Sequence, residues 1–296
     1  MLSYLHHKVR TTPWLGRLAL KAIPDLKLQV NVKPVGKVAI RLRQHRMYWL
    51  RPPLAGEGFM LGTLQRLLHE GDVVYDIGAN VGLYSRFLVQ CFHASHVYAF
   101  EPMEGNRSLL NENLTIAGCT PKVTVVPCAV GDQDGTTEFQ VDTLTSNSGT
   151  LDAVTHGKPS QSHRQYGLPP ATVSVTVSRL DTLVESNQLP RPDMIKLDVE
   201  GAEALALDGA RHVLLQHKPR LVIELHGANF ARNVLEILWS LNYHCFGYLD
   251  TNGASTYKKL SPADLEYITA PYSLHFVAAS TNQADLEQPI QDFVAA

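Results

Sequence analysis

The sequence is poor in cysteine, and none of its four cysteines belongs to a CxxC pair. They are scattered through apolar stretches, as Cys91, Cys119, Cys128 and Cys245. A zinc site or a disulfide framework would need closely spaced pairs, so we interpret these residues as buried, reduced thiols. Reduced thiols favour a cytoplasmic protein.

Long apolar runs and long basic runs are absent as well. No stretch approaches the roughly 18 consecutive apolar residues that cross a bilayer. The formal net charge is -2, whereas non-specific binding to nucleic acid needs a basic footprint. We therefore expect neither a membrane span nor a nucleic-acid partner. Since 45% of the 296 residues are hydrophobic, the chain can bury a large core.

Acidic residues are missing from residues 1–24, which carry Lys8, Arg10, Arg17 and Lys21. Pro13 and the spread charges argue against the continuous apolar core of a secretory signal. Three interpretations stay open for this segment: a helix in peripheral contact with a membrane surface, a transit-like segment, or an ordinary helix packed on the domain.

The chain divides into three regions. Residues 1–55 form an N-terminal accessory region, in which 37–42 and 47–50 are strand candidates for a hairpin. Residues 56–285 have the pattern of the main domain, and 286–296 form a C-terminal tail.

Strand and helix patterns alternate through the main domain. Each of the five strands is apolar, and they cover residues 73–76, 96–100, 122–126, 194–197 and 221–225. Helical spacing of apolar residues predicts helices at 59–69, 83–92, 106–117, after Gly201, and at 229–241. Two further strands are expected at 243–248 and 273–279. Strands separated by helices predict an α/β, doubly wound, mostly parallel sheet covered on both faces.

A polar segment at 142–171 interrupts this alternation, between strand candidates at 136–141 and 172–177. A loop of that length in a compact domain is usually a lid, a binding loop or a disordered insertion.

The strongest site pattern lies in residues 73–82, where a buried strand leads through a glycine-rich turn into a helix. Gly78 and Gly82 allow close backbone approach to a ligand, and the helix start offers free N–H groups. The GxGxxG of a dinucleotide site is absent, because position 80 is Asn. Asp76 would repel a pyrophosphate but suits a cationic amino-acid ligand, such as the methionine part of S-adenosylmethionine.

Acidic residues also follow the second and third strands. Glu101 ends the second strand, where a carboxylate accepts hydrogen bonds from ribose hydroxyls. Asn106, one helical turn further, either caps the next helix or lines the pocket. After the third strand, small residues suit an adenine ring and Asp132 could accept its exocyclic amine, unless 131–135 is a simple turn.

The ends of the fourth and fifth strands carry candidate catalytic groups. Asp198 would lie in the same crevice, as a general base on a hydroxyl or as a ligand to substrate or metal. Glu200 and Glu203 either share that role or stabilise the start of the next helix. Glu224 and His226 point to the same side by strand alternation. With Asp198 they could orient an acceptor hydroxyl or bind a divalent metal. The sequence alone does not predict a metal site.

Together these segments resemble the FkbM family of methyltransferases over about 200 residues. The motifs occur in the family's order, as DIGANVG, FEP, AVGD, IKLDVEGAE with a later DGA, and VIELH. The resemblance implies a class I Rossmann-like fold, with seven strands of which the last is antiparallel. It also implies methyl transfer from S-adenosylmethionine, usually to oxygen, on sugars, glycans or secondary metabolites.

By the same resemblance, five residues match cofactor positions: Asp76, Gly78, Asn80, Gly82 and Glu101. Asp198 and Glu200 fall in the family's signature loop, and residues 147–149 match a further Asn-Ser-Gly segment. Residues 1–55 and much of 142–171 match no family pattern, so we expect them to determine the acceptor, a small molecule or glycan bearing a hydroxyl. The alternatives are a non-catalytic scaffold on this fold and a nicotinamide-dependent oxidoreductase.

Overall fold

The computed structural model describes residues 24–45, 48, 54, 56–141, 149–151, 171–251, 254–270, 273–289 and 293. The segment interpreted above as a membrane-surface or transit-like helix falls almost entirely outside these ranges, as does most of the polar segment 142–171. None of the helices in the described ranges has both the length and the apolar character that a bilayer crossing requires.

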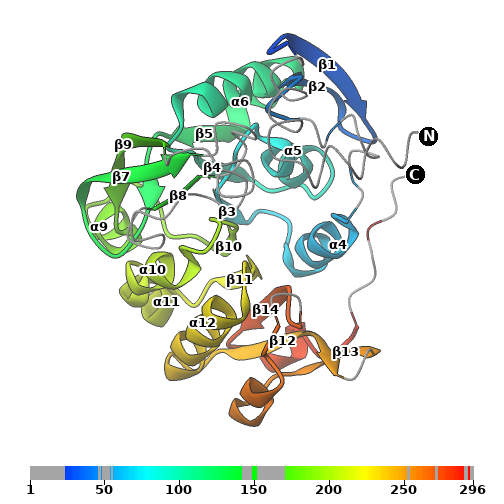
Figure 1. Ribbon diagram of the computed structural model, residues 1–296, viewed down its shortest axis with the longest axis vertical. Coiled ribbons are helices and arrows are strands. Elements are labelled where there is room, and N and C mark those ends of the chain that lie inside the picture. The colour runs from blue at the N-terminus through cyan, green and yellow to red at the C-terminus, as the bar shows by residue number, and fades with distance from the viewer. Residues whose placement is uncertain are drawn as a thin grey trace, which may run out of the picture.

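A central sheet of eight strands organises the described chain (Figure 1), in the order β13–β12–β14–β11–β10–β3–β4–β5. The strands are β3 (Val73–Ile77), β4 (His96–Phe100), β5 (Val123–Val126), β10 (Met194–Leu197), β11 (Arg220–Glu224), β12 (His244–Thr251), β13 (Ala254–Lys259) and β14 (Phe276–Ser280). Strands β5, β4, β3, β10 and β11 pair in parallel, and β14 is antiparallel to its neighbours. The α/β sheet with an antiparallel last strand is confirmed, and β13 adds an eighth strand at the edge.

Helices cover both faces of this sheet. The helices on one face are α4 (Gly58–Leu67), α5 (Leu83–Gln90) and α6 (Glu104–Ile116). Those on the other are α9 (Leu180–Glu185), α10 (Glu203–Asp208), α11 (Arg211–His217) and α12 (Ala228–Ser240). Because side chains alternate along a strand, Val74 packs in the first core and Tyr75 in the second.

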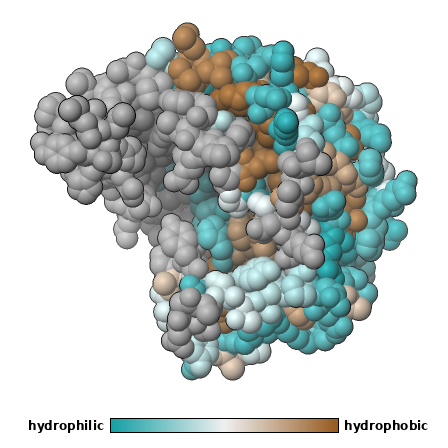
Figure 2. Space-filling view, turned by 90° about the vertical axis from the view of Figure 1, so that its right-hand side faces the viewer, coloured by the Kyte–Doolittle hydropathy of each residue, from teal (hydrophilic) through white to brown (hydrophobic). Residues whose placement is uncertain are grey.

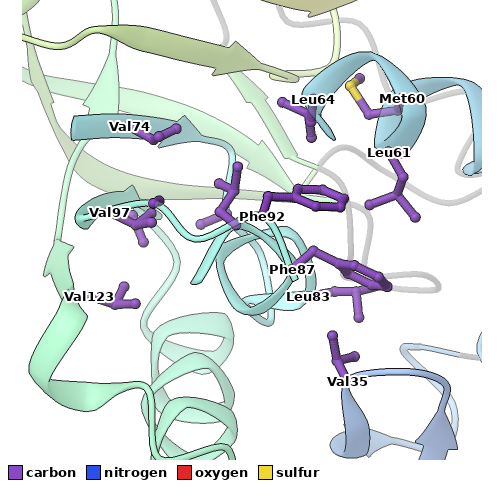
Figure 3. Close-up of a cluster of buried hydrophobic side chains, with 14 of the residues drawn as sticks. Val35, Met60, Leu61, Leu64, Val74, Leu83, Phe87, Phe92, Val97 and Val123 are labelled. Carbon is purple, nitrogen blue, oxygen red and sulfur yellow. The ribbon is translucent and has the colours of Figure 1, made fainter. Parts of the chain in front are cut away.

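Figure 3 shows the first of these cores. Val74, Val97 and Val123 come from the neighbouring strands β3, β4 and β5, and the Phe87 side chain of α5 lies between Leu61 of α4 and Val35. Leu64 of α4 belongs to the same cluster. These side chains fix α5 on the sheet, and with it the turn that connects β3 to α5.

The N-terminal hairpin differs from the prediction. Residues of the expected strand at 37–42 do form β2 (Gly36–Arg41), but β2 pairs with β1 (Lys27–Val32) before it rather than with 47–50. In that second segment Tyr48, the one described residue, is helical. The prediction missed the alternation of exposed and covered positions along β1, which places its apolar residues on one side.

The hairpin belongs to the main core. Val32, Val38 and Ile40 are buried in the same cluster as the strands of the central sheet. Leu26, directly before β1, is 60% exposed. On the side of the molecule drawn in Figure 2, apolar residues gather in the upper part, level with the hairpin in Figure 1. The surface of the molecule at the height of the hairpin is therefore partly apolar.

A second, smaller sheet has the order β6–β9–β7–β8. Its strands are β6 (Ala129–Val130), β7 (Gly135–Val141), β8 (Gly149–Leu151) and β9 (Ala171–Ser178). The antiparallel pairing of β7 with β9 confirms the strand pair expected on either side of the polar segment.

Candidate active site

A cavity opens at the carboxyl ends of β3, β4, β10 and β11, which meet at one edge of the parallel sheet. It encloses about 1040 Å³, a volume that includes solvent at its open side. Its walls are Tyr48, Glu57, Ile77, Gly78, Ala79, Asn80, Leu83, Tyr84, Phe100, Glu101, Pro102, Met103, Asn106, Cys128, Ala129, Val130, Phe139, Lys196, Asp198, Val199, Glu200, Ala202 and Glu224. Ligands of open α/β sheets bind in such a crevice.

The turn after β3 forms one wall of the cavity. Gly78 and Asn80 both have left-handed backbone, with φ of 81° and 51°. The backbone N–H groups of Gly78 and Ala79 donate to the carbonyl oxygen of Phe100, which ties this turn to the end of β4. Gly82 precedes α5 and packs on Leu110 of α6, outside the cavity wall. Gly78 and Asn80 therefore face the cavity, while Gly82 supports helix packing.

Glu101 projects into the cavity from the end of β4. Its two carboxylate oxygens accept hydrogen bonds from the backbone N–H groups of Asn80, at 2.9 Å, and Met103, at 2.8 Å. Burial raises the pKa of Glu101 to about 7, although these bonds and one from the Asn106 side chain act in the opposite direction. Asn106 lines the same wall. This buried acceptor sits where the sequence placed the ribose-binding carboxylate.

Asp76 lies behind the wall rather than in it. Its side chain is fully buried, accepts a hydrogen bond from Ser85 Oγ at 2.6 Å and lies 3.3 Å from Lys196 Nζ. Lys196 is also fully buried and contacts Asp198 Oδ2 at 3.3 Å and the carbonyl oxygen of Gly78 at 3.2 Å. The geometry thus gives Asp76 a partner within the protein instead of the direct ligand contact expected from the sequence.

Asp198, a residue of the cavity wall, lies beside His226. His226 Nε2 lies 3.7 Å from Asp198 Oδ1 and 3.7 Å from Glu200 Oε2, and its Nδ1 donates to Glu203 Oε1 at 2.8 Å. Burial alone would lower the pKa of His226, but the bond to Glu203 and the neighbouring negative charges raise it to about 10. At neutral pH the imidazole therefore carries a proton.

Glu200 and Glu203, left open by the sequence, have different surroundings. Glu203 is fully buried at the start of α10, where it also accepts a hydrogen bond from the backbone N–H of Gly201 at 3.0 Å. Glu200 lines the cavity, with its backbone in the left-handed region at φ 52°.

Glu224 ends β11 on the same side as His226, as strand alternation predicts. Its Oε1 lies 3.9 Å from His226 Nε2. Burial and the charge of Asp198 raise the pKa of Glu224 to about 8. Asp198, Glu224 and His226 thus form one cluster of titratable groups.

Asp132 lies outside this arrangement. It is exposed, it is not part of the cavity wall, and its backbone oxygen accepts a hydrogen bond from Arg179 at 2.8 Å. The residues before it, Cys128, Ala129 and Val130, do line the cavity, together with Phe139 of β7. They give that wall an apolar surface.

Sequence reasoning missed four polar residues of the cavity wall: Tyr48, Glu57, Tyr84 and Lys196. The Tyr84 hydroxyl donates to the Glu57 carboxylate, and burial raises the pKa of that carboxyl. Glu57 and Tyr48 precede every recognisable motif, so no local signal identified them. Lys196 did leave a signal, because a charged residue within an otherwise apolar buried strand needs a partner.

Comparisons with known proteins show which family the sequence matches. The family model described as "Methyltransferase FkbM domain" matches residues 76–245, more than half of the chain. The hexuronic acid methyltransferase AglP of Haloferax volcanii is 29% identical over 194 residues, which cover 64% of this chain and 71% of that protein. Methyltransferase sdnD of Sordaria araneosa is 26% identical over 184 residues, covering 56% and 70%.

A solved structure of methyltransferase FkbM from Methylobacillus flagellatus KT aligns with a TM-score of 0.46 and 18% identity. The alignment covers 78% of this chain and 50% of that one, so the chain spans half the length of that structure.

Proposed function

Because the chain belongs to the FkbM family of methyltransferases, we propose that it transfers a methyl group from S-adenosylmethionine to a hydroxyl oxygen of a sugar, glycan or other metabolite. The observation that carries this proposal is the acid-lined cavity, whose wall includes both Glu101 and Asp198. The sugar acceptor is also in keeping with the hexuronic acid named for the relative from Haloferax volcanii.

The charge of the cavity wall fits this cofactor. Five of the wall residues are acids, namely Glu57, Glu101, Asp198, Glu200 and Glu224. Lys196 is the one lysine or arginine among the described wall residues, and it is already paired with Asp76 and Asp198. A pyrophosphate would be repelled by this surface, whereas a positively charged sulfonium would be attracted. The same charge argues against a nicotinamide dinucleotide.

Particular residues would hold the cofactor. Glu101 is the acceptor for ribose hydroxyls, and the turn at Gly78 and Asn80 supplies the adjacent wall. Cys128, Val130 and other apolar wall residues suit the adenine ring. When bound, S-adenosylmethionine supplies an electrophilic methyl group on sulfur.

Asp198 is the residue to which we assign the proton of the acceptor hydroxyl. Its carboxylate lines the cavity and lies 3.3 Å from Lys196 Nζ, which holds it in place. Glu203 holds His226 through Nδ1 at 2.8 Å, so we assign His226 an orienting role rather than that of the base. Holding the hydroxyl in line with the methyl group supplies most of the acceleration.

The first experiment is calorimetric titration with S-adenosylhomocysteine. The wild-type protein should bind it, and Glu101→Ala should weaken binding strongly, because a buried acceptor is lost. Glu104→Ala is the matched control, since Glu104 is exposed three residues further on and lies outside the cavity. Absence of binding by folded wild-type protein would contradict the proposal and favour the scaffold alternative.

A second experiment tests the reaction. The protein is incubated with ¹³C-methyl-labelled S-adenosylmethionine and a panel of sugars and glycans, and the products are examined by NMR. We expect label on oxygen, and we expect Asp198→Asn to lose turnover while it keeps affinity for S-adenosylhomocysteine. Label on nitrogen, or full activity of Asp198→Asn, would contradict the assignment.

A further inference from the structure

Three metal-ligating side chains converge beside the cavity, and two of them, Asp198 and Glu224, form part of its wall. Asp198, Glu224 and His226 each offer one ligand atom, and these atoms all lie within 4.8 Å of one another. Asp198 and His226 follow the neighbouring strands β10 and β11, and Glu224 ends β11. The side chains are 21–23% exposed, so they are partly shielded from solvent.

The imidazole is held in one orientation by a buried carboxylate. Glu203 Oε1 binds His226 Nδ1 at 2.8 Å, which leaves Nε2 directed at Asp198 and Glu224, 3.7 and 3.9 Å away. A histidine that ligates a metal characteristically gives its other ring nitrogen to a carboxylate, because this bond fixes the ring and raises its basicity.

Negative charge at this corner exceeds the positive charge supplied by the described residues. Glu57 and Glu200 line the cavity beside the cluster, and Lys196 is shared between Asp198 and Asp76. Glu203 is fully buried, and its Oε2 has no hydrogen-bond partner among the described atoms. Two basic groups, Lys196 and the His226 imidazole bonded to Glu203, face these carboxylates among the described residues. Buried carboxylates whose charge is not fully compensated are costly. A cation at the cluster would offset this cost.

We propose that Asp198, Glu224 and His226 bind one divalent cation, with Glu203 as the residue that positions His226. One imidazole and two carboxylates suit Mn²⁺ or another first-row ion better than Mg²⁺, which prefers oxygen ligands throughout. Two of the ligands, Asp198 and Glu224, line the cavity. Any role of the ion in orienting an acceptor oxygen rests on the proposed function. The binding of the ion to these three side chains does not.

The test is titration of the full-length protein with MnCl₂, followed by calorimetry and by the loss of the free Mn²⁺ signal in electron paramagnetic resonance. The wild type should bind one Mn²⁺ per chain. Asp198→Asn, Glu224→Gln and His226→Gln should each abolish this binding. Glu203→Gln should weaken it about 10- to 100-fold, as loss of a residue that orients a metal ligand does.

His212→Gln is the matched control, because His212 forms an exposed pair with Glu185 on another part of the surface and should leave Mn²⁺ affinity unchanged. Retained binding of S-adenosylhomocysteine shows that each variant is folded. A wild type that binds no Mn²⁺, or binding that survives all three ligand substitutions, would overturn the site. A protein that binds Mn²⁺ but no S-adenosylhomocysteine would retain the site and overturn the proposed function instead.

Discussion

A β-carbon placed on Gly78 would lie 1.9 Å from the backbone carbonyl oxygen of Asp198. Gly78 follows β3 and Asp198 follows β10, so the two ligand-facing turns touch through their backbones. The glycine of the first motif is therefore required by packing against the second motif, in addition to its left-handed backbone at φ 81°.

Gly78→Ala should consequently destabilise the protein and impair cofactor binding. Gly71→Ala is the matched control, since Gly71 has φ 91° and nothing within 4 Å of its added β-carbon. The left-handed backbone costs about 1–2 kcal/mol in both variants, and overlap should add about 1–3 kcal/mol at Gly78 alone. Guanidinium denaturation measures the difference. Equal losses would show that the two turns separate without cost.

Lys196 supplies a second prediction, because it is fully buried between Asp76 and Asp198. Lys196→Met should cost about 3–5 kcal/mol in the free energy of unfolding, since it leaves buried carboxylates without their cation. Lys27→Met, which breaks the exposed pair with Glu112, should cost less than about 1 kcal/mol.

The double variant Asp76→Asn/Lys196→Met identifies the cause of that loss. If uncompensated charge is responsible, the double variant should lose less stability than the two single variants added together. Additive losses in urea denaturation would mean that Lys196 acts by packing alone.

The sequence predicted those parts of the fold and site that local patterns encode. Apolar periodicity located β3, β4 and β10, and Glu101 and Asp198 were found because each directly follows such a strand. Residues that depend on pairing between distant segments were not assigned. Lys196 lies opposite Asp76 only through the register of β10 with β3.

Wall residues that precede the first motif in the sequence could not be predicted for the same reason. Glu57 reaches the wall by bonding Tyr84, a residue of another helix. No spacing rule connects such a pair. Asp132 shows the opposite error, because the strand end before it was identified correctly while its side chain turns to solvent.

Glu101 leads to a prediction about pH. Since burial raises its pKa to about 7, the carboxyl is protonated in the free protein below this pH and ionised above it. An ionised carboxylate is the better acceptor for ribose hydroxyls. Affinity for S-adenosylhomocysteine should therefore rise with pH, with a midpoint near 7, and binding near the midpoint should release protons.

Calorimetry in buffers of different ionisation enthalpy measures that proton release. Glu101→Gln should bind about 1–3 kcal/mol more weakly at pH 8 and should lose the dependence on pH around 7. A flat profile for the wild type, or an unchanged profile for Glu101→Gln, would assign the titration to another group.

Asn113 of α6 links the N-terminal hairpin to the turn between β3 and α5. It accepts a hydrogen bond from the backbone N–H of Ala39 at 2.6 Å and donates to the carbonyl oxygens of Ala39 and Val81, at 3.0 and 2.9 Å. All three groups are backbone atoms of buried residues. Asn113→Ala should cost at least about 2 kcal/mol, because each unsatisfied buried group costs about 1–3 kcal/mol.

Asn111→Ala on the same helix is the control, because Asn111 is exposed and should change stability by less than about 0.5 kcal/mol. Hydrogen exchange localises the effect, since the Ala39 amide should lose protection in Asn113→Ala. Val81 belongs to the turn between β3 and α5, so loosening the hairpin should also weaken binding of S-adenosylhomocysteine. If Ala39 loses protection and this affinity is unchanged, the hairpin stabilises the fold without supporting the site.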